Sequence, residues 1–212
     1  MTIPTNSYGT LEEWAGAAYL NLTLVFTDIV DSTKIGVELG DHKWIEELFV
    51  HFSRARELAA EYDCYVVKSI GDAFMVAFRN APEAIRFALE FSANTGVAYI
   101  GIRVGINSGF VQIRENDIYG LNVNFTSRMQ HMIEHDGILV SDADKKDFEK
   151  AFGRSSSEMC WFVQRDLEVK DFGKRTLWRV MSRPLREAII KQRMAKARLL
   201  HAAFNQPGST AS

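Results

Sequence analysis

The sequence predicts an α+β fold in which helices pack on one side of a mixed β-sheet. Apolar runs of high strand propensity alternate with helical segments in the order strand, helix, two strands, helix, two strands, helix and strand, and late strands follow. A tight hairpin is expected over residues 64–78, where two apolar runs flank Gly71 and Asp72. With 212 residues, 47% of them hydrophobic, the chain is expected to form one domain with short terminal additions.

The N-terminal half is expected to supply the first strand and a long helical region. Thr10 and Glu13 have the spacing of a capping box, which predicts a helix over residues 11–20. A strand over 21–30 precedes helices over 32–62, with a break at Gly40 where Asp41 is expected to cap the second helix. Apolar residues with helical spacing are expected in the core: Trp44, Ile45, Leu48, Phe49, Phe52, Ala55, Leu58 and Ala59.

The second half is predicted to continue with a helix over 82–94, strands over 100–107 and 110–114, a helix over 123–134, a strand over 138–140, a helix to 152, a loop over 153–158, and strands over 160–169 and 176–181. Residues 184–204 read as a basic amphipathic helix, expected to dock on its own dimer rather than on an anionic membrane. The predicted division is residues 1–21 as an N-terminal tail and short helix, 22–182 as the main domain, and 183–212 as the basic helix and tail.

Composition excludes several classes of protein. A net charge of −2 and a pI near 6.2 give no basic footprint for nonspecific nucleic-acid binding. The two cysteines, Cys64 and Cys160, lie in apolar runs and are expected to be buried and reduced. No apolar run is long enough to span a membrane and no signal peptide is evident, so a cytoplasmic location is expected.

Two aspartates are candidate metal ligands. Asp28 comes near the end of the first strand, and Asp72 follows Gly71 in the hairpin turn. If the two strands are neighbours, their spacing of about 4.8 Å lets the carboxylates converge. Carboxylates at that range repel, which raises a pKa or favours a shared divalent ion, and oxygen ligands favour Mg²⁺ or Mn²⁺. The alternative is that Lys68 and Asp72 are solvated turn residues.

A third group lies on the helix expected over residues 123–134. Asn124 and Arg128 are four residues apart and therefore share one face, where an arginine and an amide suit an anionic oxygen cluster such as a phosphate. Together with F-T-D-I at 26–29 and K-x-x-G-D at 68–72, the segment D-I-x-G-x-x-V-N-x-x-S-R at 117–128 resembles the class III nucleotide cyclase family. The resemblance covers residues 22–180.

The resemblance implies a metal site and a catalytic group. Asp28 and Asp72 match the residues that bind two divalent ions, Mn²⁺ or Mg²⁺, with the backbone carbonyl of Ile29 as a further ligand. Asn124 and Arg128 match the residues that orient the ribose and stabilise the transition state at the α-phosphate.

The same resemblance implies the rest of the substrate site and the assembly. Phe26 falls in the substrate-binding motif, Lys68 and Asp117 match the base-recognition pair, and Lys170 matches the lysine that holds the terminal phosphates. The implied structure is the ferredoxin-like class III cyclase fold in a head-to-tail homodimer, with each site shared between chains. Asp31 and Asp171 stand where the family usually has glycine, and Thr126 stands where it usually has a small apolar residue.

The expected activity is cyclisation of a nucleoside triphosphate to the 3′,5′-cyclic monophosphate and pyrophosphate. Lys68 as donor and Asp117 as acceptor suit adenine, cytosine or uracil, so the base stays open on hydrogen bonding alone. The chain looks like the stand-alone uridylate and cytidylate cyclases of bacterial antiphage defence, which signal to a separate effector, and this analogy favours UTP over ATP. The non-enzymatic alternatives are an inactive regulatory subunit and an RNA-binding module.

Overall fold

The structure is a computed structural model that describes residues 9–182. An eight-stranded mixed sheet has the order β2-β3-β1-β4-β6-β8-β7, and β5 pairs with β4. All neighbouring strands are antiparallel except β4 and β6. The strands are β1 Tyr19–Ile29, β2 Cys64–Ile70, β3 Ala73–Phe78, β4 Ile102–Arg114, β5 Asp117–Tyr119, β6 Gly137–Ser141, β7 Cys160–Val169 and β8 Gly173–Ser182. The main helices are α1 Leu11–Ala15, α2 Ser32–Leu39, α3 Asp41–Ala59, α4 Ala81–Ala93, α5 Leu121–His131 and α6 Asp142–Phe152.

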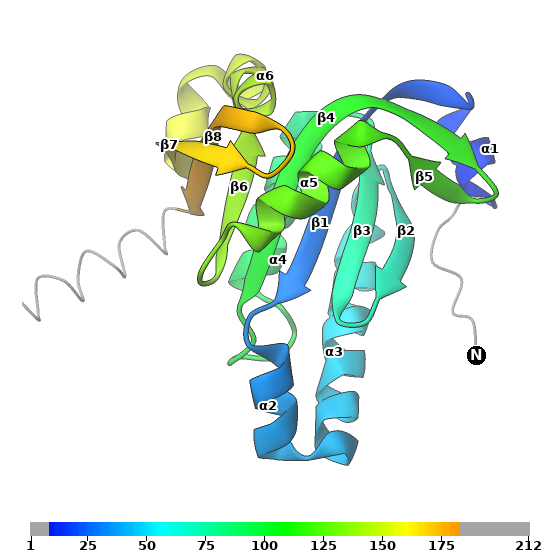
Figure 1. Cartoon of the computed structure of the whole chain (residues 1–212), viewed down its shortest axis with the longest axis vertical. Coiled ribbons are helices and arrows are strands. Elements are labelled where there is room, and N and C mark those ends of the chain that lie inside the picture. The colour runs from blue at the N-terminus through cyan, green and yellow to red at the C-terminus, as the bar shows by residue number, and fades with distance from the viewer. Residues whose placement is uncertain (1–8, 183–212) are drawn as a thin grey trace, which may run out of the picture.

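Helices cover both faces of the sheet, so the α+β prediction is confirmed but the expectation of helices on one side is wrong (Figure 1). The larger core joins one sheet face to residues of α3, α4 and α6, such as Leu58, Phe87 and Phe148. The opposite face carries α1 and α5, whose side chains join two smaller clusters. Alternation along β1 explains the division, because Val25 faces the larger core and Leu24 the opposite face.

The first helix is shorter than predicted. The Thr10–Glu13 capping box is present, but Gly16 adopts the left-handed conformation and ends α1 after Ala15. β1 therefore begins at Tyr19 and pairs with β4 along eleven residues. Leu11 and Trp14 are fully buried, so α1 is anchored against the sheet.

The predicted turn at residues 108–109 is absent from this part of the chain. Ser108 and Gly109 continue β4 opposite Thr23 and Leu22 of β1. A Cβ at position 109 would lie 2.1 Å from the side-chain nitrogen of Asn122, so a larger residue there would have to shift that side chain. The glycine that suggested a turn therefore lies in β4, at a point where α5 comes close to the strand.

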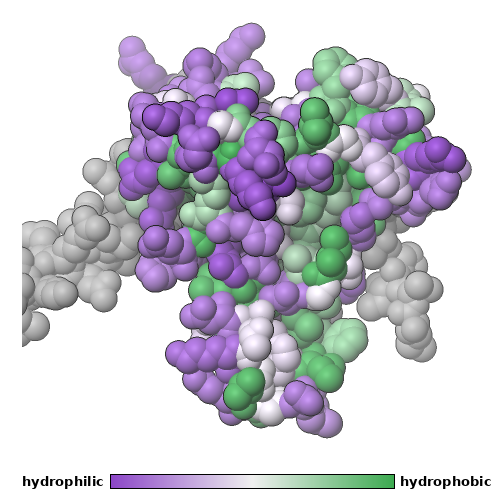
Figure 2. All heavy atoms as spheres, viewed as in Figure 1, coloured by the Kyte–Doolittle hydropathy of each residue, from purple (hydrophilic) through white to green (hydrophobic). Residues whose placement is uncertain are grey.

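The pair of helices α2 and α3 projects beyond the end of the sheet (Figure 1). Ile45 and Phe49, which were expected in the core, are 50% and 62% exposed because the N-terminal part of α3 lies outside the sheet's footprint. The predicted Asp41 cap is also wrong, since Gly40 is the N-cap and no side chain caps α3. Figure 2 shows hydrophobic residues over this projecting part of the molecule, where Val37 and Val50 are exposed as well.

The C-terminal part of the described chain differs only at its connections. Residues 153–158, expected as a loop, form a 3₁₀ turn, Gly153–Ser155, and part of a short helix, α7 Ser156–Met159. The strands β7 and β8 are joined by a tighter turn than predicted, because β8 begins at Gly173. Both cysteines are free and buried as predicted, and burial raises the pKa of each thiol to about 12. The basic helix predicted over 184–204 lies outside the described residues.

Candidate functional site

Two carboxylates meet at the end of the sheet where α2 and α3 begin to project. Asp28 is the penultimate residue of β1, and Asp72 follows Gly71 in the two-residue turn between β2 and β3. Gly71 has φ 62°, the positive angle that the first position of such a turn requires. Burial and then the charge of Asp72 raise the pKa of Asp28, which places the two carboxylates within electrostatic reach of each other.

The second carboxylate has an unsatisfied oxygen. Asp72 Oδ2 is buried and accepts no hydrogen bond from any described residue. A buried acceptor without a donor is costly, and a divalent cation between two carboxylates removes that cost. The donor set of two carboxylates and a main-chain carbonyl, that of Ile29, therefore fits a hard cation such as Mg²⁺ or Mn²⁺. Among the described residues, no group of three or more acidic, histidine or cysteine side chains is arranged to hold a metal ion.

Arg103 is a site residue that the sequence reasoning missed. It lies directly opposite Asp28 in the β1–β4 ladder, and its Nη2 donates to Asp28 Oδ2 over 2.5 Å and to the carbonyl of Ile29 over 3.4 Å. The guanidinium therefore contacts both groups that were expected to bind metal through β1. It partly offsets the rise in the pKa of Asp28. Only the strand register reveals this contact, because residues 28 and 103 are far apart in the sequence.

His51 is a second residue that was missed, and it lies behind Asp72. The ring is fully buried, its Nδ1 contacts the carbonyl of Thr95 over 2.9 Å, and burial lowers its pKa while Asp72 opposes the shift. The imidazole is thus held neutral beside the acidic turn. Its ring packs against the rings of Phe74, which follows the turn on β3, and Phe91 of α4.

The predicted base-recognition pair is in direct contact within one chain. Lys68 Nζ lies 2.5 Å from Asp117 Oδ2, joining β2 to β5. Both side chains are partly exposed. Lys68 pairs across the strands with Met75 of β3, and Met75 pairs with Phe26 of β1. Met75 and Phe26 are 1% and 7% exposed. Phe26 therefore lies in the floor of the sheet near Lys68 rather than on the surface.

The predicted transition-state arginine is held by the β7–β8 turn. Arg128 Nη1 donates to the carbonyl of Lys170 over 2.6 Å and lies 2.5 Å from Asp171 Oδ2. Asn124, one turn earlier on α5, is exposed. Among the described residues, no hydrogen bond or ion pair joins the Asp28–Asp72 group, the Lys68–Asp117 pair and Arg128 to one another.

Two departures from the family's motifs now have a backbone explanation. Asp31 and Asp171, which replace the usual glycines, have φ of 55° and 66°, in the left-handed region. Aspartate is one of the few non-glycine residues enriched there. The backbone that glycine would adopt is thus kept, and at position 171 the substitution adds a carboxylate that pairs with Arg128.

Helix α5 owes its position to Gly105 on β4. A Cβ at this residue would lie 2.6 Å from the carbonyl oxygen of Thr126 and 2.9 Å from the amide nitrogen of Gln130. Only glycine allows the helix backbone to approach the strand so closely. The helix that carries Asn124 and Arg128 is therefore fixed directly on the strand that carries Arg103.

Comparison with known proteins agrees with this geometry. The profile of the family described as "Adenylate and Guanylate cyclase catalytic domain" matches residues 16–159. An adenylate cyclase from Streptomyces griseus is 29% identical over 124 residues, which is 58% of this chain and 31% of that protein. The chain spans between 5% and 31% of the length of the first curated relatives it matches.

Solved structures share the fold. The adenylyl cyclase CyaB from P. aeruginosa superposes with a TM-score of 0.66 at 21% identity, covering 77% of this chain and 95% of that one. The guanylate cyclase domain of RhGC from Catenaria anguillulae, solved with GTP, has a TM-score of 0.62 at 25% identity and covers 79% of this chain and all of that one. The protein has the mixed α+β fold of the class III cyclases, and it belongs to the adenylate and guanylate cyclase catalytic domain family.

None of the described helices is both long and apolar enough to cross a membrane.

Proposed function

We propose that the protein is a nucleotidyl cyclase that converts a nucleoside triphosphate to the 3′,5′-cyclic monophosphate and pyrophosphate. The observation that carries the proposal is the buried, unsatisfied oxygen of Asp72 beside Asp28, at the position where the family's metal-binding motifs fall. Every group that the motifs require is present, which disfavours an inactive regulatory subunit. Incubation of the pure protein with each triphosphate and Mn²⁺ tests the proposal through release of pyrophosphate.

The reaction forms a bond between the ribose 3′-oxygen and the α-phosphorus and breaks the bond from that phosphorus to the pyrophosphate. Asp28, Asp72 and the carbonyl of Ile29 would hold two divalent ions, which supply activation of the hydroxyl and neutralisation of the leaving oxygens. Arg128 stabilises charge on the α-phosphoryl oxygens, and Asn124 orients the ribose. Lys170 binds the terminal phosphates.

Arg103 is the cation nearest to the proposed metal ligands. Its guanidinium donates to Asp28 Oδ2 and to the carbonyl of Ile29. With divalent ions on those oxygens, Arg103 would be free to donate to phosphate oxygens instead. We therefore add Arg103 to the proposed phosphate-binding residues.

The proposed assembly is a homodimer with two sites, each built from both chains. In the described chain, the metal-binding group, the base pair and Arg128 form three separate sets of contacts. A head-to-tail partner would bring the metal aspartates of one chain to Lys68, Asp117, Asn124 and Arg128 of the other. One known cyclase domain was solved in a "non-canonical dimeric" form, and another in a monomeric state.

For the base, we favour uracil. Lys68 and Asp117 form an ion pair, so a base must separate them in order to bind. The neighbouring side chains of Met75 and Phe26 are buried in the sheet. A pyrimidine needs less space than a purine. ATP is the second candidate, since several relatives are named adenylate cyclases. With uracil as the base, the proposed role is synthesis of a second messenger for antiphage defence, sensed by a separate effector.

The first prediction concerns metal binding. Asp72→Asn should weaken Mn²⁺ binding, measured by calorimetry on the apoprotein, and reduce turnover by at least about 100-fold, because even second-shell changes at metal sites cost roughly 10–100-fold. The thermal unfolding midpoint should not fall, since the variant removes a buried negative charge without changing shape. The control Asp147→Asn neutralises an exposed acid on α6 and should behave as wild type. Wild-type Mn²⁺ affinity in Asp72→Asn would remove the metal assignment.

The second prediction concerns the acid that pairs with Arg128. Asp171→Asn keeps a residue that tolerates positive φ but removes the carboxylate, so the guanidinium gains net charge toward the triphosphate. Exposed ion pairs are worth about 0.2–1 kcal/mol, so kcat/KM should rise by up to about fivefold. Glu168→Gln, an exposed acid on β7, is the matched control. A fall in kcat/KM would mean instead that Asp171 positions Arg128 for the substrate.

The third prediction concerns the base. Initial rates with UTP, CTP, ATP and GTP under Mn²⁺ should give kcat/KM for a pyrimidine at least about tenfold above that for ATP, because a packed site rejects an added ring. A clear preference for ATP would assign the protein to the adenylate cyclases and withdraw the proposed defence role.

A further inference from the structure

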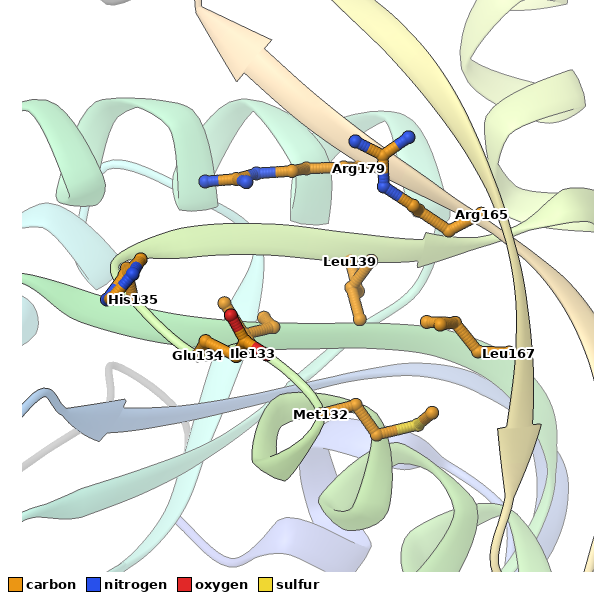
Figure 3. A pocket seen from close by; sticks show the side chains of 8 residues that line it. All are labelled: Met132, Ile133, Glu134, His135, Leu139, Arg165, Leu167 and Arg179. Atoms are coloured by element: carbon orange, nitrogen blue, oxygen red, sulfur yellow. The ribbon is translucent and has the colours of Figure 1, made fainter.

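A pocket separate from the candidate site lies on the same face of the sheet as α5, beyond the C-terminal end of that helix (Figure 3). The cavity measures about 260 Å³. Its apolar wall comes from Met132 and Ile133 after α5, Leu139 of β6 and Leu167 of β7. Its charged wall comes from Arg165 of β7 and Arg179 of β8. The metal and base groups described above contribute none of these side chains.

The strand register places both arginines on one face. Arg165 pairs with Leu177 across the β7–β8 ladder, and Arg179 lies two residues further along β8, so the two side chains are diagonal neighbours. Leu139 pairs with Arg179 in turn, and with Gly105 on its other side. Gly105 is the residue on which α5 rests. The helix therefore separates this pocket from Phe26 and Lys68, which continue the same row across the sheet.

The two guanidinium groups are not neutralised by acids. Arg179 Nη2 donates to the main-chain carbonyl of Asp136 over 3.1 Å, and its Nε is buried with no acceptor among the described residues. Arg165 Nη1 donates to the carbonyl of Gln164 over 2.8 Å. Within the described chain, neither arginine has a carboxylate within 4.0 Å, whereas Arg103 and Arg128 each have one at 2.5 Å. The pocket is therefore lined by two arginines and one exposed acid, Glu134, with which neither arginine pairs in the described chain.

We propose that this pocket binds a small phosphate-type oxyanion. Guanidinium groups present planar donor pairs that match phosphate oxygens, and both arginines line the pocket, where the buried Arg179 Nε has no acceptor among the described residues. Pockets for drug-sized ligands measure about 300–1,000 Å³, so a cavity of 260 Å³ suits inorganic phosphate or a compact phosphate ester rather than a nucleoside triphosphate. The apolar wall accommodates the small organic part of an ester.

The pocket adjoins the elements that hold Arg128. Met132 and Leu167 of the pocket pack against the buried cluster of Met129, Ile133 and Val169. That cluster joins α5 to the strand leading into the turn at Lys170, which accepts a hydrogen bond from Arg128. An anion that draws β7, β8 and the end of α5 together would therefore stabilise the arrangement of Arg128. This coupling rests on the proposed function, whereas the binding itself does not.

The binding is tested by calorimetric titration of inorganic phosphate into the full chain, in chloride buffer of matched ionic strength. One phosphate should bind per pocket, and Arg165→Gln should weaken this binding by at least about tenfold, since a charge-assisted contact is lost. Arg165 is exposed, so its replacement should leave the unfolding midpoint unchanged. Arg154→Gln removes an equal charge from an exposed turn and should bind phosphate as wild type does.

Two outcomes overturn the proposal. Wild-type phosphate affinity in Arg165→Gln excludes the pocket, and so does the absence of saturable binding in the wild type. Lys170→Ala separates the two candidate phosphate sites: loss of binding in Lys170→Ala with retention in Arg165→Gln would assign the phosphate to the proposed active site. Because binding is read by heat and not by turnover, the result is independent of whether the cyclase proposal holds.

The coupling is read separately, from initial rates at subsaturating triphosphate. A phosphate-dependent change in rate that Arg165→Gln loses and Arg154→Gln keeps supports it. Identical responses in all three proteins overturn the coupling.

Discussion

The repulsion between Asp28 and Asp72 is the constraint on which the candidate site depends. Both residues lie at one end of the sheet, where burial and then the charge of Asp72 raise the pKa of Asp28. Arg103 supplies one compensating positive charge through Asp28, but the buried oxygen of Asp72 stays unsatisfied within the described chain. This end of the sheet is thus arranged for more positive charge than the protein's own side chains provide.

The antiparallel pairing of β1 with β3 and β4 produces this arrangement. β1 lies between β3 and β4, so Asp28 has the acidic turn on one side and Arg103 on the other. On the same sheet face, Gly105 allows α5 to rest directly on β4. The helix divides that face into the part that carries Lys68, Met75 and Phe26 and the part that forms the two-arginine pocket. Because α5 also carries Asn124 and Arg128, both regions are joined to the proposed transition-state residue.

The sequence predicted well what depends on local pattern. The hairpin around Gly71 and the break at Gly40 follow from turn chemistry, and the structure confirms them. The predicted end of the first helix was wrong because the left-handed backbone of Gly16 ends α1 early. Gly109 was interpreted as a turn residue, although it lies within β4 where α5 comes close to the strand. Ile45 and Phe49 were assigned to the core because periodicity identifies a helix face but not what covers it.

The site residues divide in the same way. Lys68 and Asp117 were paired through motif resemblance, and the structure brings them into contact. Arg103 escaped notice because an arginine in a strand carries no local signal, and only the ladder places it opposite Asp28. The Arg128–Asp171 pair likewise joins residues 43 positions apart, through a turn whose aspartate looked like a mere departure from glycine. Sequence patterns thus identified the groups, and tertiary pairing determined which of them neutralise each other.

The central claim is that each active site is built from two chains, and mixing two inactive variants tests it most directly. Asp72→Ala removes a proposed metal ligand, and Arg128→Ala removes the proposed transition-state charge, so each variant alone should lose nearly all turnover. In a mixed dimer, one site carries both lesions and the other carries neither, so activity should return toward half the wild-type rate per heterodimer. If subunit exchange is demonstrated and no activity returns, the shared-site dimer is wrong, and Asp72 and Arg128 must act within one chain.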